Sequence, residues 1–148
     1  MRALVQRVSE GSVMIDGQLH AKIGKGFVIL LGVRKGDTAE GARFLADKCS
    51  SLRVFDDGAG KMNLSLRDVG GESLVISQFT LYGDVRRGNR PGFADAAPPE
   101  EAEPLYEEFV RRMKETLGDS SVSTGVFRAM MNVHIANDGP VTLLLESA

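Results

Sequence analysis

The sequence predicts an α/β or α+β fold, in which a largely antiparallel sheet carries two main helices. Two observations predict it. Candidate segments follow the order β-rich, α, β, α, β, and 43% of the 148 residues are hydrophobic, enough to fill one core. No repeat, low-complexity tract or linker interrupts the chain, so we expect residues 1–148 to form a single domain.

The first third of the chain is expected to be β-structure. Apolar residues alternate with polar ones in Ala3–Val8 and Ser12–Ile15, and Asp16-Gly17 is a typical hairpin turn. After a second turn at Gly24-Lys25-Gly26, the continuous apolar run Phe27–Val33 indicates a buried central strand.

The middle of the chain predicts a helix between strands. Asp37 or Thr38 can cap a helix that runs to about Ser51. A short strand is expected at Leu52–Phe55, followed by a poorly patterned segment to Gly71. The run SLVISQF, residues 73–79, is again typical of a strand.

The last third predicts a loop, a second helix and two strands. Residues 83–99 are rich in Gly, Pro and Arg and indicate an ordered loop. Pro98-Pro99-Glu-Glu opens a helix that Gly118 ends, with an apolar face at Leu105, Phe109, Met113 and Leu117. Strands are expected at Met131–Ala136 and Val141–Glu146.

Composition excludes several classes of protein. The formal charge of −2, from 18 basic and 20 acidic residues, argues against a protein that coats nucleic acid, so any nucleic acid must be gripped locally. A single cysteine, Cys49, forbids an intrachain disulfide and is expected to be a small buried hydrophobe. The apolar stretches are too short for a signal peptide or a membrane span, which predicts a soluble, cytoplasmic protein.

Familiar catalytic motifs are absent from the sequence. It contains no Walker loop, dinucleotide fingerprint, paired-cysteine zinc site or His-Glu-x-x-His. We expect His20 to be exposed and His134 to be a structural histidine within a strand. Neither suggests a catalytic triad, and we expect no metal and no cofactor.

Two segments differ from generic scaffold. The first lies where a strand ends and backbone N–H groups leave the ladder, and consists of Ser77, Gln78, Phe79 and Thr80. A polar strand terminus with one core phenylalanine is the simpler interpretation. The second is Asn137–Thr142, which reads as an ordinary turn except that Pro140 cannot donate to a strand ladder.

At these segments the chain resembles the D-aminoacyl-tRNA deacylase family. SQFTL and NDGPVT match the family's signature motifs. Four further segments also occur in the order expected along the chain: VQRV, GKMNLSL, RGNRPGF and TGVFRAMMNVHI. The resemblance covers essentially the whole chain. One departure is Gly92, where the family's loop usually has serine; the lost hydroxyl would loosen the loop or remove one contact.

The resemblance implies a homodimer of β-barrel-like subunits with an active site at each end of the interface. The segment Ser77–Thr80 would form the pocket floor, and Gly139-Pro140, with a cis bond, would reach across from the partner subunit. Phe127 and Met131 match positions that wall the pocket. The implied reaction is hydrolysis of the ester of D-aminoacyl-tRNA, and also of glycine mischarged onto tRNA.

The implied mechanism uses the RNA itself. The resemblance implies RNA-assisted catalysis, in which the tRNA 2′-hydroxyl beside the ester positions or activates water. Thr80 has no obvious histidine partner that would make it a nucleophile. We hypothesise that the N–H groups of Phe79 and Thr80 stabilise the oxyanion. Contacts to acceptor-end phosphates are expected from arginines of the following loop, which otherwise form a solvated surface: Arg86, Arg87 and Arg90.

Two other functions stay open at this point. One is a related deacylase for other mischarged tRNAs, such as L-alanine on threonine tRNA, which would differ in the state of the Gly-Pro bond. The other is a non-catalytic nucleic-acid-binding module, against which the slight negative charge argues.

Overall fold

The computed structural model of the chain describes residues 1–147. Its strands are β1 (Arg2–Ile15), β2 (Gln18–Ile23), β3 (Gly26–Gly32), β4 (Phe55–Asp56), β5 (Met62–Leu64), β6 (Glu72–Ser77), β7 (Val122–Thr124) and β8 (Asn132–Glu146). The helices are α1 (Ala39–Ser51) and α2 (Pro99–Leu117), with 3-10 turns η1 (Phe79–Tyr82) and η2 (Asp119–Ser121).

One mixed sheet organises the fold. Its path is β2-β1-β3-β6-β7, with β8 paired to the other edge of β1, while β4 and β5 pair separately. β1 is antiparallel to β2, β3 and β8, whereas β6 is parallel to β3 and β7. The parallel pairings arise because α1 and α2 lie in the connections from β3 to β6 and from β6 to β7, as parallel strands require. The sheet curls until β2 contacts β6 and β7.

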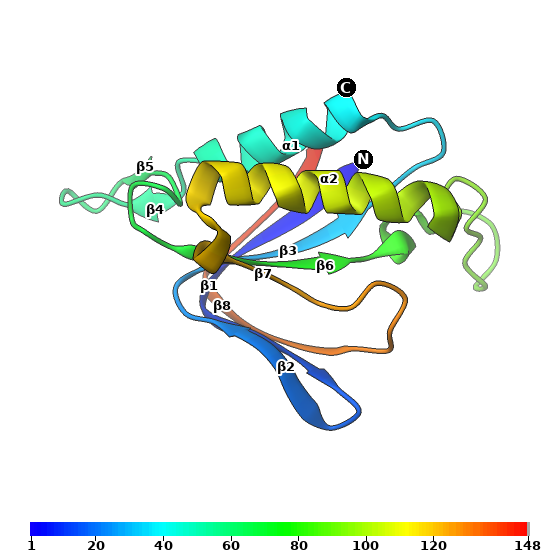
Figure 1. Ribbon diagram of the computed structural model, residues 1–148, viewed down its shortest axis with the longest axis horizontal. Helices are drawn as coiled ribbons and strands as arrows, with labels where there is room; N and C mark the ends of the chain where they lie inside the picture. Colours follow the sequence, from blue (N-terminus) through cyan, green and yellow to red (C-terminus); the bar gives the residue numbers. More distant parts are fainter. Residues whose placement is uncertain (148) are drawn as a thin grey trace.

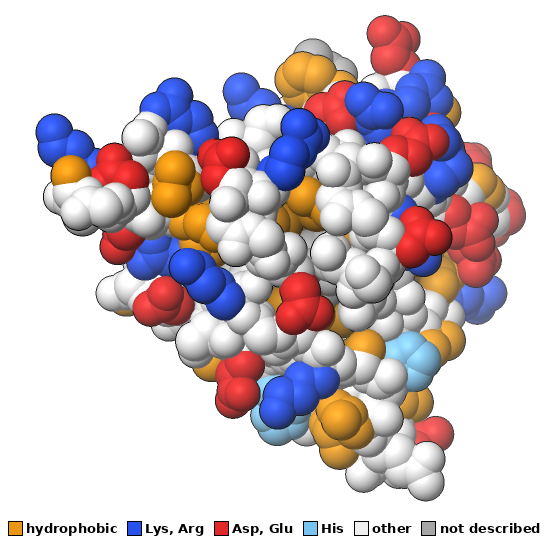
Figure 2. Space-filling view, turned by 60° about the vertical axis from the view of Figure 1, so that its left-hand side comes forward, with side chains coloured by type: hydrophobic (Ala, Val, Ile, Leu, Met, Phe, Trp, Pro, Cys, Tyr) orange, Lys and Arg blue, Asp and Glu red, His pale blue; other side chains and the backbone are white. Residues whose placement is uncertain are grey.

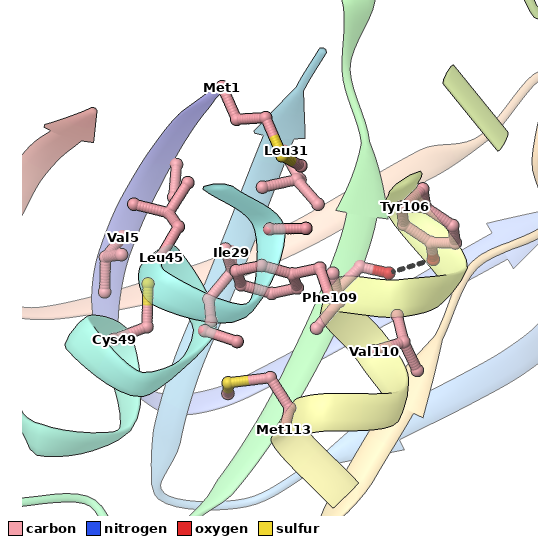
Figure 3. Close-up of a cluster of buried hydrophobic side chains, with 14 of the residues drawn as sticks. Met1, Val5, Ile29, Leu31, Leu45, Cys49, Tyr106, Phe109, Val110 and Met113 are labelled. Carbon is pink, nitrogen blue, oxygen red and sulfur yellow. Dashed lines mark hydrogen bonds between the residues drawn. The ribbon is translucent and has the colours of Figure 1, made fainter. Parts of the chain in front are cut away.

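Both helices cover the same face of the sheet (Figure 1). Between them and the sheet lies the main core, which includes the fully buried Phe27, Ile29, Leu45, Phe109 and Met113. Figure 3 shows these α1 and α2 side chains meeting above β3. Full burial of each such side chain stabilises the fold by about 1.5–3 kcal/mol.

A second, smaller cluster lies inside the curl, on the other face of the sheet, and includes Val8, Val13, Val28, Leu74 and Ile76. β3 and β6 therefore have apolar neighbours on both faces. This explains why their sequences are continuous apolar runs rather than alternating ones.

The predicted strands are present, but several boundaries were wrong. β1 is one strand, not two, and β8 runs unbroken from Asn132 to Glu146, because register shifts let β1 and β8 pair along their whole length. The expected strand Leu52–Phe55 is also wrong, since only Phe55 and Asp56 pair with β5. The strand expected over residues 73–79 ends at Ser77.

Individual side-chain predictions were confirmed. Thr38 caps α1 by accepting from Gly41 N at 3.1 Å, and Cys49 is fully buried, which raises the pKa of its thiol to about 12. His20 is exposed as predicted, and His134 lies within a strand as predicted, with an exposed side chain on β8. Within residues 1–147, neither helix has the length and apolarity needed to cross a bilayer.

Candidate functional site

The segment Ser77–Thr80, called the floor segment below, lies at the carboxyl end of β6. Gln78 N donates to Leu31 O at 2.8 Å, which is the last bond between β6 and β3 before the chain turns into η1. The Gln78 side-chain amide donates to the Thr80 hydroxyl. Phe79 is 56% exposed, so the floor segment is open to solvent in the single chain.

Two backbone donors at the start of η1 have no acceptor within it. The first bond of this turn runs from Leu81 N to Gln78 O at 3.3 Å, so the N–H groups of Phe79 and Thr80 precede it. The sequence predicted free donors at this strand end. Their position at an exposed turn is one that a developing negative charge could approach.

Gly32, at the end of β3, lets η1 lie directly on the sheet. A Cβ at this position would stand 3.1 Å from Gln78 O and 3.1 Å from Leu81 Cβ. Any larger residue would displace η1 and the floor segment with it. The sequence offered one signal for this role, a glycine at the end of an apolar strand, where close backbone approach is common.

Phe127 and Met131 lie on either side of β6. Met131 packs on the cluster inside the curl, and its Sδ would be only 2.5 Å from a Cβ added at Gly125. Phe127 packs on the main core beside Tyr106, with ring centroids 5.8 Å apart, and Tyr106 donates to Val75 O at 2.8 Å. The loop between them therefore passes along the end of β6, the strand that leads into the floor segment.

The segment Asn137–Thr142, called the Gly-Pro turn below, is a bulge in β8. The Gly139–Pro140 peptide bond is cis, and both residues are exposed. Gly139 has φ +122, and a Cβ there would meet Val141 Cγ2 at 2.9 Å and Arg7 Nη2 at 3.0 Å. Only glycine fits this position without strain.

Arg7 and Asn137 hold this turn. The guanidinium of Arg7, only 8% exposed, donates to Asp138 O at 3.1 Å and to Val54 O at 2.6 Å. The side-chain amide of Asn137 donates to Arg7 O at 3.0 Å and to Val141 O at 3.1 Å. Sequence reasoning assigned Arg7 and Asn137 no individual role beyond their places in the matched segments VQRV and NDGPVT, because side-chain bonds to distant carbonyls leave no pattern in the sequence.

Within one chain the floor segment and the Gly-Pro turn are far apart. Ser77 lies beside Leu31 on β3, and the path to β8 then crosses β1, so three strand spacings separate them. They also lie at different positions along the strand direction. Leu31, beside the floor segment, is opposite Ala3, whereas the turn bulges opposite Arg7. At about 4.8 Å per strand and about 3.3 Å per residue, each displacement is roughly 14 Å.

The loop after η1 is closed by backbone bonds. Asp84 N donates to Gly92 O at 2.7 Å and Gly92 N to Asp84 O at 2.9 Å, and Phe93 packs edge-on against Phe79 with centroids 5.0 Å apart. These contacts fix the loop to the floor segment without a side chain at Gly92, where an added Cβ has no neighbour nearer than 4.0 Å.

The arginines expected to contact RNA lie exposed on this loop. Arg87 and Arg90 are exposed, and Arg86 donates to both carboxylate oxygens of Asp84 at 2.9 and 2.8 Å. These hydrogen bonds lower the pKa of Asp84 to about 2. The charge of Arg86 is therefore already compensated. On the face shown in Figure 2, acidic and basic side chains are interspersed rather than gathered into a basic area.

Neither histidine reaches the floor segment. The floor segment lies at the same position along the strands as Ala3 of β1. His134 pairs with Ser12, which is nine residues farther along β1. It lines a surface cavity of about 480 Å³ between β1, β2 and β8. His20 lies on β2, at the same end of the sheet. The floor thus offers amide and hydroxyl groups and backbone donors.

Comparison with known proteins matches nearly the whole length of the chain. The family described as D-Tyr-tRNA(Tyr) deacylase matches residues 4–146. A "D-aminoacyl-tRNA deacylase" of Anaeromyxobacter dehalogenans (strain 2CP-C) is 56% identical over 147 residues, covering 99% of this chain and 97% of that protein.

Two solved structures share the fold. One, described as "c-Myc DNA Unwinding Element Binding Protein", has a TM-score of 0.95 and 42% identity, and the match covers 100% of this chain and 99% of the other. A probable eukaryotic D-amino acid tRNA deacylase has a TM-score of 0.84 at 17% identity over 98% of each chain and supports the nearly closed barrel alone. The chain therefore belongs to the D-Tyr-tRNA(Tyr) deacylase family, whose members are hydrolases acting on aminoacyl-tRNA esters.

Proposed function

We propose that the protein hydrolyses the ester between a D-amino acid and the 3′ end of tRNA and rejects L-aminoacyl groups. The observation that carries this proposal is the floor segment, where the N–H groups of the exposed residues Phe79 and Thr80 precede the first bond of η1, beside the Gln78 and Thr80 side chains. Such donors suit an ester whose carbonyl oxygen becomes negative during attack. Family membership supplies the substrate class.

The proposed chemistry is RNA-assisted. An aminoacyl ester is already activated, and the 2′-hydroxyl of the terminal ribose lies beside it, able to position or activate water. The side chains of the floor segment include no group that serves as a base near neutral pH. The Thr80 hydroxyl, which accepts from Gln78, would hold water or substrate, and Gln78 would orient the terminal adenosine.

The pocket would be completed by a second copy of the chain. Leu30, Leu4 and Leu144 pair in register across β3, β1 and β8, on the sheet face opposite the helices, and Leu144 is 53% exposed. This row lies about midway between the floor segment and the Gly-Pro turn. A two-fold axis parallel to the plane of the sheet, passing near Leu4 and Leu30, would stack these faces of two subunits. It would place the Gly-Pro turn of one subunit over the floor segment of the other.

Selection by handedness would follow from this roof. The carbonyls of Gly139 and Pro140, fixed by Arg7 and Asn137, would stand above the substrate α-carbon and exclude an L side chain while leaving the D direction open. D side chains of many sizes would fit. Glycine has no side chain to exclude, so glycine mischarged onto alanine tRNA would also be hydrolysed.

The test is hydrolysis of tyrosyl-tRNA charged with the D or the L amino acid. The wild-type protein should release D-tyrosine and leave the L ester intact. Pro140→Ala should hydrolyse the L ester measurably, because the turn loses the fixed backbone angle of proline. Pro104→Ala, the same change at an exposed position of α2, is the control. Unchanged rejection of the L ester in Pro140→Ala would contradict the proposed filter.

A second candidate function comes from the 42% identical structure described as a DNA unwinding element binding protein. Under that alternative the chain would bind DNA without hydrolysing an ester. The net charge of −2 provides little electrostatic attraction for duplex DNA. The same assay decides between the two, because a DNA-binding module would leave both tyrosyl esters intact.

A further inference from the structure

A hollow of about 360 Å³ lies next to the floor segment, where the start of β1 and the end of β3 meet the loop after η1. Three arginines, two aspartates and an aromatic ring line it: Arg2, Arg34, Arg86, Asp84, Asp95 and Tyr82. Tyr82 is the last residue of η1, one 3-10 turn from Phe79. The hollow is thus the surface that a strand leaving the floor segment on this side would cross.

Arg2 is held rigidly at the wall of this hollow. Its guanidinium carbon lies 4.7 Å from the centroid of the Tyr82 ring, its Nε donates to Glu146 at 2.6 Å, and its Nη1 donates to Leu81 O at 2.9 Å. These bonds use two of the five N–H donors of a guanidinium. Three remain, on a group tied directly to η1.

Arg34 is the least compensated cation of the hollow. Its nearest carboxylate oxygen is Asp95 Oδ2, 3.6 Å from Nη2, which is longer than a hydrogen bond. The side chain is 58% exposed, and within residues 1–147 its guanidinium makes no hydrogen bond. Arg86 differs, because its paired contacts with Asp84 already satisfy it.

We propose, resting on the deacylase function above, that this hollow binds a backbone phosphodiester of the tRNA acceptor strand just before the terminal adenosine, with Arg34 and Arg2 as its donors. Guanidinium groups bind phosphate oxygens through paired, charge-assisted hydrogen bonds. Phosphate contacts add affinity without reading sequence, which suits an enzyme that meets many tRNAs. One such subsite provides the local grip that a chain with net charge −2 requires.

Asp95 sets the strength of this contact. Its carboxylate faces Arg34 across the hollow, so it orients the guanidinium but also repels an incoming phosphate. Replacing it with asparagine removes the repulsion and keeps the shape. Asp95→Asn and Arg34→Ala should therefore change tRNA recognition in opposite directions.

The experiment compares two substrates, D-tyrosyl-tRNA and the 3′-ester of D-tyrosine with adenosine, which carries no phosphate. The measured quantity is the ratio of kcat/KM for the tRNA to kcat/KM for the adenosine ester. Arg34→Ala should lower this ratio roughly five- to ten-fold, as expected for one lost charged hydrogen-bond pair at an exposed site. Asp95→Asn should raise it. The control, Lys61→Ala, removes one exposed charge beside β5, at the opposite end of the molecule from this loop (Figure 1).

Salt dependence gives a second reading of the same contact. The slope of log kcat/KM for tRNA against log salt should become shallower by about 0.7 in Arg34→Ala, the value for one phosphate on a single strand. Inorganic phosphate should inhibit tRNA hydrolysis by the Lys61→Ala control and not by Arg34→Ala. Competition of phosphate with the adenosine ester, which places no phosphate in the hollow, would contradict the proposed subsite.

The failure of this inference is distinct from failure of the deacylase function. If the wild-type protein hydrolyses both substrates but Arg34→Ala keeps the ratio and the salt slope of Lys61→Ala, the phosphate subsite is wrong and the deacylase stands. If neither substrate is hydrolysed, the deacylase function is wrong. Equilibrium binding of uncharged tRNA then still tests the hollow, and equal affinities of Arg34→Ala and Lys61→Ala would overturn it.

Discussion

The floor segment and the Gly-Pro turn are held in place by different physical means. The floor continues a strand buried on both faces and rests on Gly32, so apolar packing positions it. The turn is exposed and is positioned by polar bonds from Arg7 and Asn137. Damage to the floor should therefore impair hydrolysis itself, whereas damage to the turn should impair the choice between D and L esters.

The largest effect is expected at Arg7, which supports the turn. Arg7→Ala removes two charged hydrogen bonds to buried or partly buried carbonyls and should lower the free energy of unfolding by about 3 kcal/mol. It should also admit L esters. Urea denaturation and hydrolysis of L-tyrosyl-tRNA measure the two effects.

Arg111→Ala is the control for this prediction. Arg111 pairs with Glu108 and Glu115 on the exposed side of α2, where such pairs contribute about 0.5 kcal/mol or less. Equal destabilisation by the two substitutions would contradict the assigned role of Arg7.

A smaller loss of stability is expected from Gly32→Ala, which disturbs the floor, and its effects on hydrolysis and on selectivity should be the reverse of those of Arg7→Ala. The added methyl group would press on Gln78 O and Leu81 at 3.1 Å and should cost about 1–2 kcal/mol of stability. Hydrolysis of the D ester should fall while rejection of the L ester stays intact. If L esters were admitted here as well, the two regions would not act separately. Gly58→Ala, at an open position with no neighbour within 4 Å and no positive φ, controls for the loss of glycine.

The smallest effect is expected from Thr80→Ala. With RNA-assisted chemistry, the hydroxyl only positions water or substrate, and kcat should fall by about ten-fold or less, the weight of one neutral hydrogen bond. Single-turnover hydrolysis of D-tyrosyl-tRNA measures it. Complete loss of activity with tRNA binding retained would restore the Thr80 side chain as the catalytic group.

Local patterns were enough to predict the elements that build the floor. The continuous apolar run at residues 27–33 and the strand-like run at residues 73–79 indicated buried strands, although the second strand ends two residues earlier, at Ser77. The apolar face of α2 was predicted correctly at Phe109 and Met113, which are fully buried. These features depend on periodicity, which the sequence displays directly.

Long-range pairing was beyond prediction from patterns. The unbroken course of β8 depends on its pairing with β1, more than a hundred residues away, so the turn residues between its halves suggested two strands instead. The buried cation at Arg7 was missed for the same reason, because its carbonyl partners at Val54 and Asp138 lie on distant segments. The three-residue strands β5 and β7 are too short to show any period.

The central claim is that the Gly-Pro turn of one subunit lies over the floor segment of another. Replacing Phe79 with the photoreactive p-benzoylphenylalanine places a crosslinker on the floor, and mixing ¹⁴N- and ¹⁵N-labelled protein marks the origin of each peptide. After irradiation, mass spectrometry should find residue 79 joined to the peptide that contains Gly139-Pro140, with mixed isotopic labels. Crosslinks confined to peptides of the same label, such as the neighbouring Phe93 loop, would contradict the account.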